Sequence, residues 1–240
     1  MSYVRTALAG LFIAAIPLFL VTSNVRWAFN TADIYELGFT RHNVTATTGL
    51  SGDQLSRAAM QIRDYFNSDE DDLHVLVNFG SGPQELFNDT ETRHMRDVKE
   101  LVSNTYRVQE GLFLFLFLFV SLGFLLRGSE FAGIMRRLLT YGSAVTVVLV
   151  LAVGLVSLVA FGPLFTLFHE VSFANDFWLL DPRTSFLVRM FPFNFWLETT
   201  IILAVASVAE AGAIVGLIAA IRRWHQWRRR AAQSRVPRYV

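Results

Sequence analysis

The sequence predicts a mainly α-helical membrane protein with four transmembrane helices and a small α/β cap outside the membrane. Hydrophobic residues make up 53% and charged residues 17% of the 240-residue chain. Soluble domains carry about 25% charged residues, so the composition argues against an ordinary soluble domain. Apolar runs of membrane-spanning length predict the four spans, and an uneven distribution of arginine predicts their orientation.

Four stretches almost free of Asp, Glu, Lys and Arg mark the predicted spans, because a membrane helix needs about 17–25 mainly apolar residues. The predicted spans are residues 5–25, 108–126, 138–161 and 198–221. The second contains an alternating Leu-Phe run, Leu112–Phe119, whose period of two is typical of a strand. A single strand cannot satisfy its backbone in lipid, so we predict a helix there. We expect the first span to be retained, since it is longer than the usual core of a cleaved signal peptide.

The distribution of arginine predicts the orientation of the chain in the membrane, because short cytoplasmic segments are enriched in Lys and Arg. The loop 127–137 and the tail 222–240 are rich in arginine and nearly free of acidic residues, so both are predicted to be cytoplasmic. Residues 26–107 and 162–197 then form two outer loops, and both termini lie in the cytoplasm. Trp224 and Trp227 in the tail are interpreted as interfacial anchors. The net charge of +1 gives nucleic-acid binding no support.

The first outer loop is predicted to contain two helices and a hairpin. Apolar residues at helical spacing after an N-capping serine indicate a helix, Gly and Pro residues indicate a turn, and short apolar runs indicate strands. They are a helix over Ser51–Asp64, a strand over Leu73–Phe79, a turn at Gly80–Pro83, a strand at Leu86-Phe87, and a helix from Asn88 or Thr90 through Val102.

Histidines in the outer loops are the candidate functional residues. Glu91 and Asp97 lie three residues before and after His94, so on a helix a carboxylate can orient its imidazole. His169 follows a long apolar run and Gly162-Pro163, which places it at the outer membrane surface. A structural role is the alternative for each. The sequence has no phosphate-binding loop, nucleotide signature or serine-hydrolase motif, and it has no cysteine for a disulfide or a metal site.

Several segments carry a family resemblance. They are His94–Val98 preceded by Leu86–Asn88, then Phe168–Asp176, Trp178–Pro182 and Leu187–Pro192, with further similarity at Thr48–Ser51 and Asp64–Asn67. These segments resemble the signatures of the bacterial lipoprotein intramolecular transacylase family. Together with the four-span layout, the resemblance covers nearly the whole chain.

The resemblance implies an enzyme, an intramolecular O-to-N acyltransferase in the bacterial cytoplasmic membrane with its active site facing outside. Such an enzyme moves the sn-2 acyl chain of a diacylglyceryl lipoprotein to the α-amino group of the same N-terminal cysteine, which leaves a lyso-form lipoprotein. The implied partners are lipoproteins and membrane lipid, with no nucleotide, nucleic acid, cofactor or metal. The two family histidines fall on His94 and His169. A histidine with a pKa near 6.5 is a suitable general base for an amine with a pKa near 8.

Four further residues are expected to support the two histidines. Asp97 or Glu91 is expected behind His94, and Arg189, Asn175 or backbone N–H groups can stabilise a developing oxyanion. Two tryptophans of the second outer loop, Trp178 and Trp196, are interpreted as part of an interfacial aromatic belt.

Two alternatives stay open. One is a membrane lipid hydrolase. Its metal-dependent form would use His94 and His169 as metal ligands beside Asp97 or Asp181, but the sequence lacks the clustered ligand spacing of a zinc site. The other is a non-catalytic integral membrane sensor or scaffold whose first outer loop is a binding module.

The transacylase hypothesis requires His94 and His169 to meet in one pocket at the outer leaflet. A straight helix from His94 to Glu110 would lift His94 about 24 Å above the membrane. We therefore predict either a strong tilt of this helix or a break in it near Ser103–Thr105, where three poor helix formers are adjacent.

Glu210 lies near the middle of the fourth predicted span, among small residues that allow close helix packing. We predict that its side chain is buried in the helix bundle, protonated, and hydrogen-bonded to Ser143 or Ser157.

Overall fold

The computed structural model describes residues 2–233 and separates them into two compact units. The helical unit comprises Leu112–Leu151 with the described residues of Met1–Leu20 and Val205–Val240. The cap unit comprises Val21–Gly111 and Ala152–Ala204. The last residues of the predicted cytoplasmic tail, 234–240, lie outside the described part of the chain.

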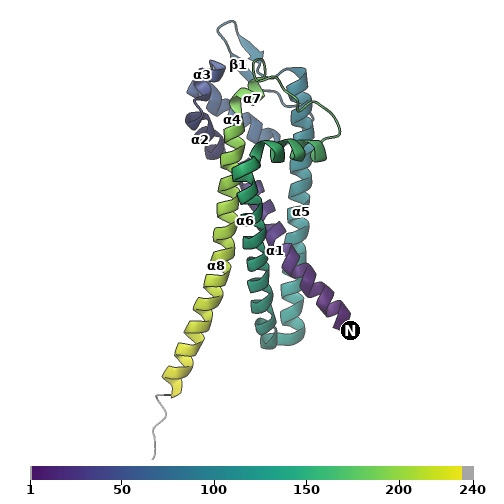
Figure 1. The fold of residues 1–240 in the computed structure, drawn as a ribbon, viewed down its shortest axis with the longest axis vertical. Helices are drawn as coiled ribbons and strands as arrows, with labels where there is room; N and C mark the ends of the chain where they lie inside the picture. The colour runs from purple at the N-terminus through teal and green to yellow at the C-terminus, as the bar shows by residue number, and fades with distance from the viewer. Residues whose placement is uncertain (1, 234–240) are drawn as a thin grey trace, which may run out of the picture. The chain divides into compact units, whose positions relative to one another are not determined.

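Helices dominate the structure, as the sequence predicted (Figure 1). The four longest are α1 (Ser2–Asn30), α5 (Asp89–Arg127), α6 (Phe131–Ser172) and α8 (Phe193–Gln233). The shorter elements are α2 (Ala32–Arg41), α3 (Val44–Thr48), α4 (Gly52–Tyr65), α7 (Phe186–Met190), a 3-10 helix at Gly128–Glu130, and the strands β1 (Leu76–Asn78) and β2 (Pro83–Glu85).

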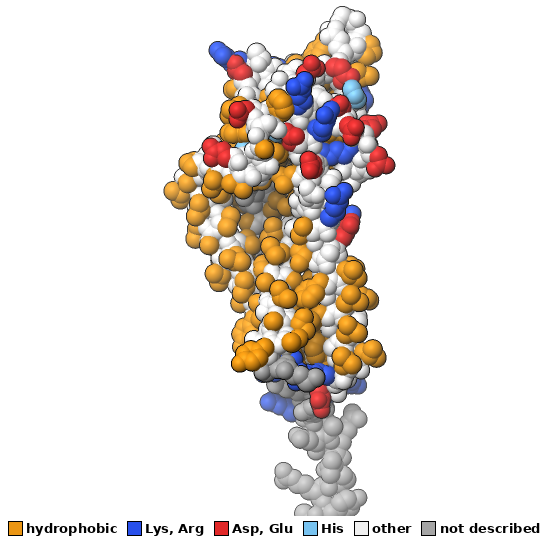
Figure 2. All heavy atoms as spheres, turned by 90° about the vertical axis from the view of Figure 1, so that its right-hand side faces the viewer, with side chains coloured by type: hydrophobic (Ala, Val, Ile, Leu, Met, Phe, Trp, Pro, Cys, Tyr) orange, Lys and Arg blue, Asp and Glu red, His pale blue; other side chains and the backbone are white. Residues whose placement is uncertain are grey.

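Three helical stretches are long and apolar enough to cross a membrane: Tyr3–Asn30, Asp89–Ser172 and Phe193–Arg228. The second contains both α5 and α6 and the 3-10 helix between them. The alternating run Leu112–Phe119 is helical within α5, as predicted. Figure 2 shows hydrophobic side chains covering much of the visible face of the long helices, whereas charged side chains gather over the part that carries the hairpin.

A tight turn connects α5 to α6 within the helical unit. Gly128 has a φ of 54°, in the left-handed region where a residue without Cβ is not strained. Phe131, the first residue of α6, is buried, and its ring lies where a Cβ on Gly123 of α5 would be. This close approach keeps the two helices side by side beyond the turn (Figure 1).

The core of the helical unit joins four helices. Phe12 and Ile16 of α1 pack with Phe131, Met135 and Leu138 of α6, Ala211 of α8 and partly buried phenylalanines of α5. A Cβ on Gly142 of α6 would lie 2.7 Å from a side-chain atom of Ile16, so a glycine is required at this crossing.

The predicted burial of Glu210 is wrong. Ala211 is fully buried against α1 and α6, and the neighbouring Glu210 is exposed because successive helical residues point about 100° apart. Ser143 is buried, but its hydroxyl has no hydrogen-bond partner in the described residues, so it is not the predicted partner of Glu210.

The cap unit begins with helices that the sequence analysis did not predict, α2 and α3. The helix predicted from Ser51 is confirmed as α4: the Ser51 hydroxyl accepts from the backbone N–H of Gln54, and the Gln54 side chain accepts from the backbone N–H of Ser51. The predicted hairpin is also present, although its second strand lies at Pro83–Glu85 instead of Leu86-Phe87. Val77 is paired with Gln84 in antiparallel register.

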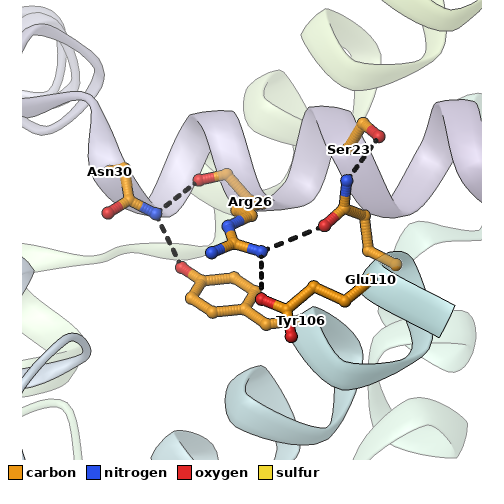
Figure 3. A network of polar contacts seen from close by, with 6 residues as sticks. Ser23, Arg26, Asn30, Tyr106 and Glu110 are labelled. Carbon is orange, nitrogen blue, oxygen red and sulfur yellow. Dashed lines mark hydrogen bonds and ion pairs between the residues drawn. The ribbon is translucent and has the colours of Figure 1, made fainter. Parts of the chain in front are cut away.

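A polar network ties α1 to α5 in the cap unit (Figure 3). The Arg26 guanidinium donates to Glu110 at 2.8 Å and to Gln109 at 3.0 Å, and it lies over the Tyr106 ring. Asn30 donates to the Tyr106 hydroxyl at 2.8 Å. The end of the first predicted span is therefore fixed beside the start of the second.

Candidate active site

The two candidate histidines are brought together by a bend in α6. The predicted break at Ser103–Thr105 is wrong, because α5 is helical without interruption from Asp89 to Arg127, and the alternative, a strong tilt of this helix in the membrane, stays a prediction. The irregular residue is Ala160 in α6, with φ −136° and ψ 40°. Pro163 explains it: proline has no N–H to bond the carbonyl four residues earlier, and its ring clashes with that carbonyl. Beyond the bend, the end of α6 crosses to α5 (Figure 1).

His94 and His169 converge as predicted. Their ring centroids lie 6.0 Å apart, and the ring planes are inclined by 29°. Only 8% of His94 and 7% of His169 is exposed. The pair therefore lies in a nearly dry environment, where water does not compete strongly for the imidazole nitrogens.

Aromatic rings enclose the pair. Phe165 lies 4.3 Å from the ring of His169 and Phe168 lies 5.2 Å from it, while Phe173 contacts both histidines. Trp178 lies 5.0 Å from His169. Trp178, interpreted from the sequence as an interfacial anchor, lies against the histidine pair instead. Its position within one of the family-like segments was the signal.

A backbone hydrogen bond sets the tautomer of His169. Its Nδ1 lies 2.7 Å from the carbonyl oxygen of Phe165. A carbonyl can only accept, so Nδ1 carries the proton, and in the neutral ring Nε2 has the free lone pair. Burial lowers the pKa of His169 below its usual value, and the hydrogen bond to Phe165 opposes that shift.

Burial also keeps His94 neutral. Its pKa is lowered to about 4, mainly by burial and then by the nearby His169, against an opposing effect of Asp97. The Nδ1 of His94 is buried and has no hydrogen-bond partner in residues 2–233. Burying an unpaired N–H costs more than burying a lone pair, so the favoured tautomer carries its proton on Nε2.

Asp97 and Asn175 connect α5 to the segment that follows α6. The Asn175 amide donates to the Asp97 carboxylate at 2.9 Å, and its oxygen accepts from the backbone N–H of Phe177. Both groups of the amide are thus occupied. The contact holds the loop that follows His169 against the helix that carries His94.

Glu91 makes a buried clamp and is not bonded to the Nδ1 of His94. Its carboxylate, in a residue that is 1% exposed, accepts from the hydroxyl of Ser185 at 2.5 Å and from the backbone N–H of Leu187 at 2.8 Å. It also accepts from the backbone N–H of Asn88, whose side chain caps α5 by accepting from the N–H of Glu91. One carboxylate therefore fixes the start of both α5 and α7.

Arg189 is directed to backbone carbonyls. Its guanidinium donates to Ser185 at 3.1 Å and to Thr47 at 3.3 Å, and it lies over the ring of Phe186. These contacts join α7 to α3.

A cavity of about 600 Å³ opens beside the start of α5, and neither histidine lines it. Its lining residues are Asn88, Asp89, Thr90, Leu179, Leu180, Asp181, Thr184 and Ser185. Among residues 2–233 no group of three or more His, Asp or Glu side chains is placed to hold a metal ion. The zinc hypothesis therefore lacks its ligand set in this part of the chain, since Asp97 is bonded to Asn175 and Asp181 to Arg183.

Comparison with solved structures shows a known membrane fold. The chain superposes on the lipoprotein intramolecular transacylase Lit from Bacillus cereus with a TM-score of 0.75 and 17% identity, covering 96% of this chain and 100% of the other. A histidine-to-arginine variant of that protein gives a TM-score of 0.69 at 17% identity, covering 94% of this chain and 96% of the other. No curated relative matches the chain.

The sequence comparison goes further than the fold. The family model described as lipoprotein intramolecular transacylase Lit matches residues 10–196. This span is most of the chain and contains both histidines and the residues around them. The protein therefore belongs to the lipoprotein intramolecular transacylase family.

Proposed function

We propose that the protein moves the sn-2 acyl chain of a diacylglyceryl lipoprotein to the α-amino group of the same N-terminal cysteine, with His94 and His169 as catalytic residues. In this reaction the amine nitrogen bonds to the ester carbonyl carbon, the bond from that carbon to the glycerol oxygen breaks, and the amine proton passes to the released alcohol. The observation that carries the proposal is the buried pair of imidazoles 6.0 Å apart in a chain of this family.

The two imidazoles suit different tasks. The free lone pair on Nε2 makes His169 the base that takes the amine proton and later returns it to the alcohol. The neutral His94, with its proton on Nε2, donates to the oxygen that becomes negative in the tetrahedral intermediate. We propose positioning roles for Asp97, Asn175, Glu91 and Arg189, whose contacts hold the surrounding segments together.

The aromatic surroundings favour transfer over hydrolysis. Water is the competing nucleophile for the ester, and a dry site suppresses it. The ring of Phe173 contacts both histidines, and the ring of Trp178 contacts His169. Their arrangement supports a site in which the tethered amine is the nucleophile that reaches the carbonyl.

The end of α6 supports delivery from the lipid. Beyond the bend, Leu167, Phe168 and Val171 are 53%, 47% and 79% exposed, while His169 between them is buried. A helix with one such apolar face lies in the membrane interface. We propose that this segment rests on the outer leaflet and presents His169 to the ester.

The topology proposal follows from charge and length. We propose that α5 and α6 cross the membrane separately, which gives four spans in a bacterial cytoplasmic membrane with both termini inside. The stretch Asp89–Ser172 is 84 residues long, about four times what a 30 Å hydrocarbon layer requires. Arg127 and Glu130 flank the turn between the two helices.

Mass spectrometry of lipoprotein N-termini tests the proposed function. Purified protein in lipid vesicles with a diacylglyceryl lipopeptide should give a product of unchanged mass with an amide-linked acyl chain. His169→Ala and His94→Ala should each slow the reaction by roughly 10²–10⁴-fold, the usual contribution of a general acid or base. His74→Ala is the matched control, because His74 is exposed on the hairpin and contacts Glu85. Free fatty acid as the main product would indicate a hydrolase. Activity that neither substitution changes would contradict the assignment of His94 and His169 as catalytic residues.

A further inference from the structure

The helical unit contains a second polar site, which the transacylase reaction does not use. A cavity of about 240 Å³ lies between α6 and α8. Arg136, Arg137, Thr140 and Tyr141 of α6 line it together with Ile218 and Arg222 of α8. The volume equals about eight water molecules at roughly 30 Å³ each, which is enough for a phosphodiester group with part of its glycerol.

The charge of this cavity is one-sided. Three of its six lining residues are arginines and none is acidic. No ion pair formed within residues 2–233 involves Arg136, Arg137 or Arg222. Like charges held around one cavity repel one another, and a bound anion removes that cost. Guanidinium groups bind phosphate oxygens in a bidentate manner, which favours phosphate over a spherical anion.

The lining changes from polar to apolar along both helices. Arg137 directly precedes the charge-free run of α6, and Arg222 directly follows the charge-free residues 211–221 of α8. Ile218 lies one helical turn inside Arg222, and the exposed Tyr141 lies one turn inside Arg137. Cationic groups at the rim and an apolar side chain beneath them are complementary to a phospholipid, whose phosphate lies outside its acyl chains. Basic pockets between membrane helices bind anionic lipids in this way.

We propose that this cavity binds the phosphate group of an anionic phospholipid, held by the guanidinium groups of Arg136, Arg137 and Arg222 with its glycerol against Ile218. The site is separate from the histidine pair, which lies in the cap unit. Inorganic phosphate shares the recognised group but has nothing to place against Ile218, so the lipid is the expected ligand.

Native mass spectrometry of the purified protein in detergent tests the proposal. Phosphatidylglycerol should be retained as one tight adduct, with a dissociation constant at least tenfold lower than that of phosphatidylcholine of the same chain length. The combined substitution of Arg136, Arg137 and Arg222 by Gln should raise the phosphatidylglycerol dissociation constant at least tenfold. The matched control replaces Arg127, Arg223 and Arg230 by Gln, which removes equal charge outside the cavity and should change binding less than twofold.

Further measurements keep the test decisive. If the glutamine variant does not fold, lysine at the same three cavity positions replaces it in the test. Lysine keeps the positive charge but cannot bind phosphate in a bidentate manner, so it should weaken lipid binding several-fold. Millimolar inorganic phosphate should not displace the lipid, and displacement would overturn the lipid assignment in favour of a free phosphate site. Equal retention of the two lipids, or equal loss of binding in the control variant, would overturn the site itself.

Discussion

Burial determines the protonation of the histidine pair more than any charged neighbour does. For His94 the effect of burial exceeds that of Asp97, and for His169 it exceeds that of the hydrogen bond to Phe165. Both imidazoles are therefore neutral at pH 7, which a base and a neutral hydrogen-bond donor both require. A carboxylate was expected from the sequence to orient the imidazole of His94, but the Nδ1 of His94 has no hydrogen-bond partner in residues 2–233.

The pH dependence of acyl transfer should follow the protonation of the substrate amine and not that of the two histidines. A base works in its neutral form, which persists above its pKa, and that pKa is lowered for His169 and about 4 for His94. Moving from pH 8 to pH 6 thus leaves both imidazoles active, while an amine with a pKa near 8 becomes protonated. We expect kcat/KM to rise about tenfold per pH unit from pH 6 and to level off near pH 8. If kcat/KM instead rose with a midpoint at pH 6.5 and stayed constant above pH 7, the lowered pKa values of the two histidines would be contradicted.

The Asp97–Asn175 contact should act on catalysis through position. A hydrogen bond to a charged acceptor contributes roughly 1.5–3 kcal/mol, and the lower value applies here because both side chains are only partly buried. Asp97→Ala and Asn175→Ala should each lower kcat more than they raise KM, and the double variant should be no worse than the poorer single one. Asp97→Asn keeps an acceptor and should recover much of the rate. Asp176→Ala, at an exposed neighbouring position, is the control, and additive losses in the double variant would show that the two residues act independently.

Among the elements, those fixed by local chemistry were predicted best. The capping residues Ser51 and Asn88 each place an oxygen where the first N–H groups of a helix lack partners, and that signal is present in the sequence alone. The helices α2 and α3 were missed because their stability comes from packing: Tyr35, Phe39 and Val44 are buried in the core of the cap unit. Sequence spacing alone does not reveal such a partner.

The bend that assembles the site was predicted in the wrong helix. Ser, Asn and Thr weaken a helix by fractions of a kcal/mol each, and the hydrogen bonds and packing of α5 outweigh that preference. Proline removes a hydrogen bond and adds a clash worth about 3 kcal/mol, so Pro163 was the stronger signal. The convergence of His94 and His169 was predicted from their expected function, and the roles of Glu91, Arg189 and Trp178 depend on contacts between distant segments.

Restoring the helix at Pro163 should separate His94 from His169. In Pro163→Ala the new N–H can bond the carbonyl of Val159, which straightens α6 and carries His169 away from His94. A displacement of 1 Å can cost about 100-fold in rate, so we expect kcat to fall at least tenfold. The chain has no cysteine, so spin labels at Glu100→Cys and Glu170→Cys report the distance between α5 and the end of α6 without background. Pro17→Ala in α1 is the control, and an unchanged distance with unchanged kcat would show that packing holds the bend without Pro163.

For the molecule as a whole, the charge distribution and one ion pair support the proposed membrane topology. Arg26 of α1 is paired with Glu110 of α5 at 2.8 Å, so the two charges that end the first apolar run and begin the second are at one level in the cap unit. At the other end of α5, Arg127 and Glu130 flank the turn into α6. We propose that α5 crosses the membrane once between these charged points, which makes α5 and α6 separate spans.

Labelling of single cysteines in intact cells decides the topology. Asp69→Cys lies in the first outer loop and should react with a membrane-impermeant thiol reagent, because that loop is proposed to face outward. Ser129→Cys in the turn between α5 and α6 and Gln226→Cys near the end of α8 should react only after the cells are opened, because arginine-rich segments stay inside. Reaction of all three after opening is the control for access. Labelling of Ser129→Cys in intact cells would invert the orientation and place the histidine pair on the cytoplasmic side, where an outer-leaflet lipoprotein cannot reach it.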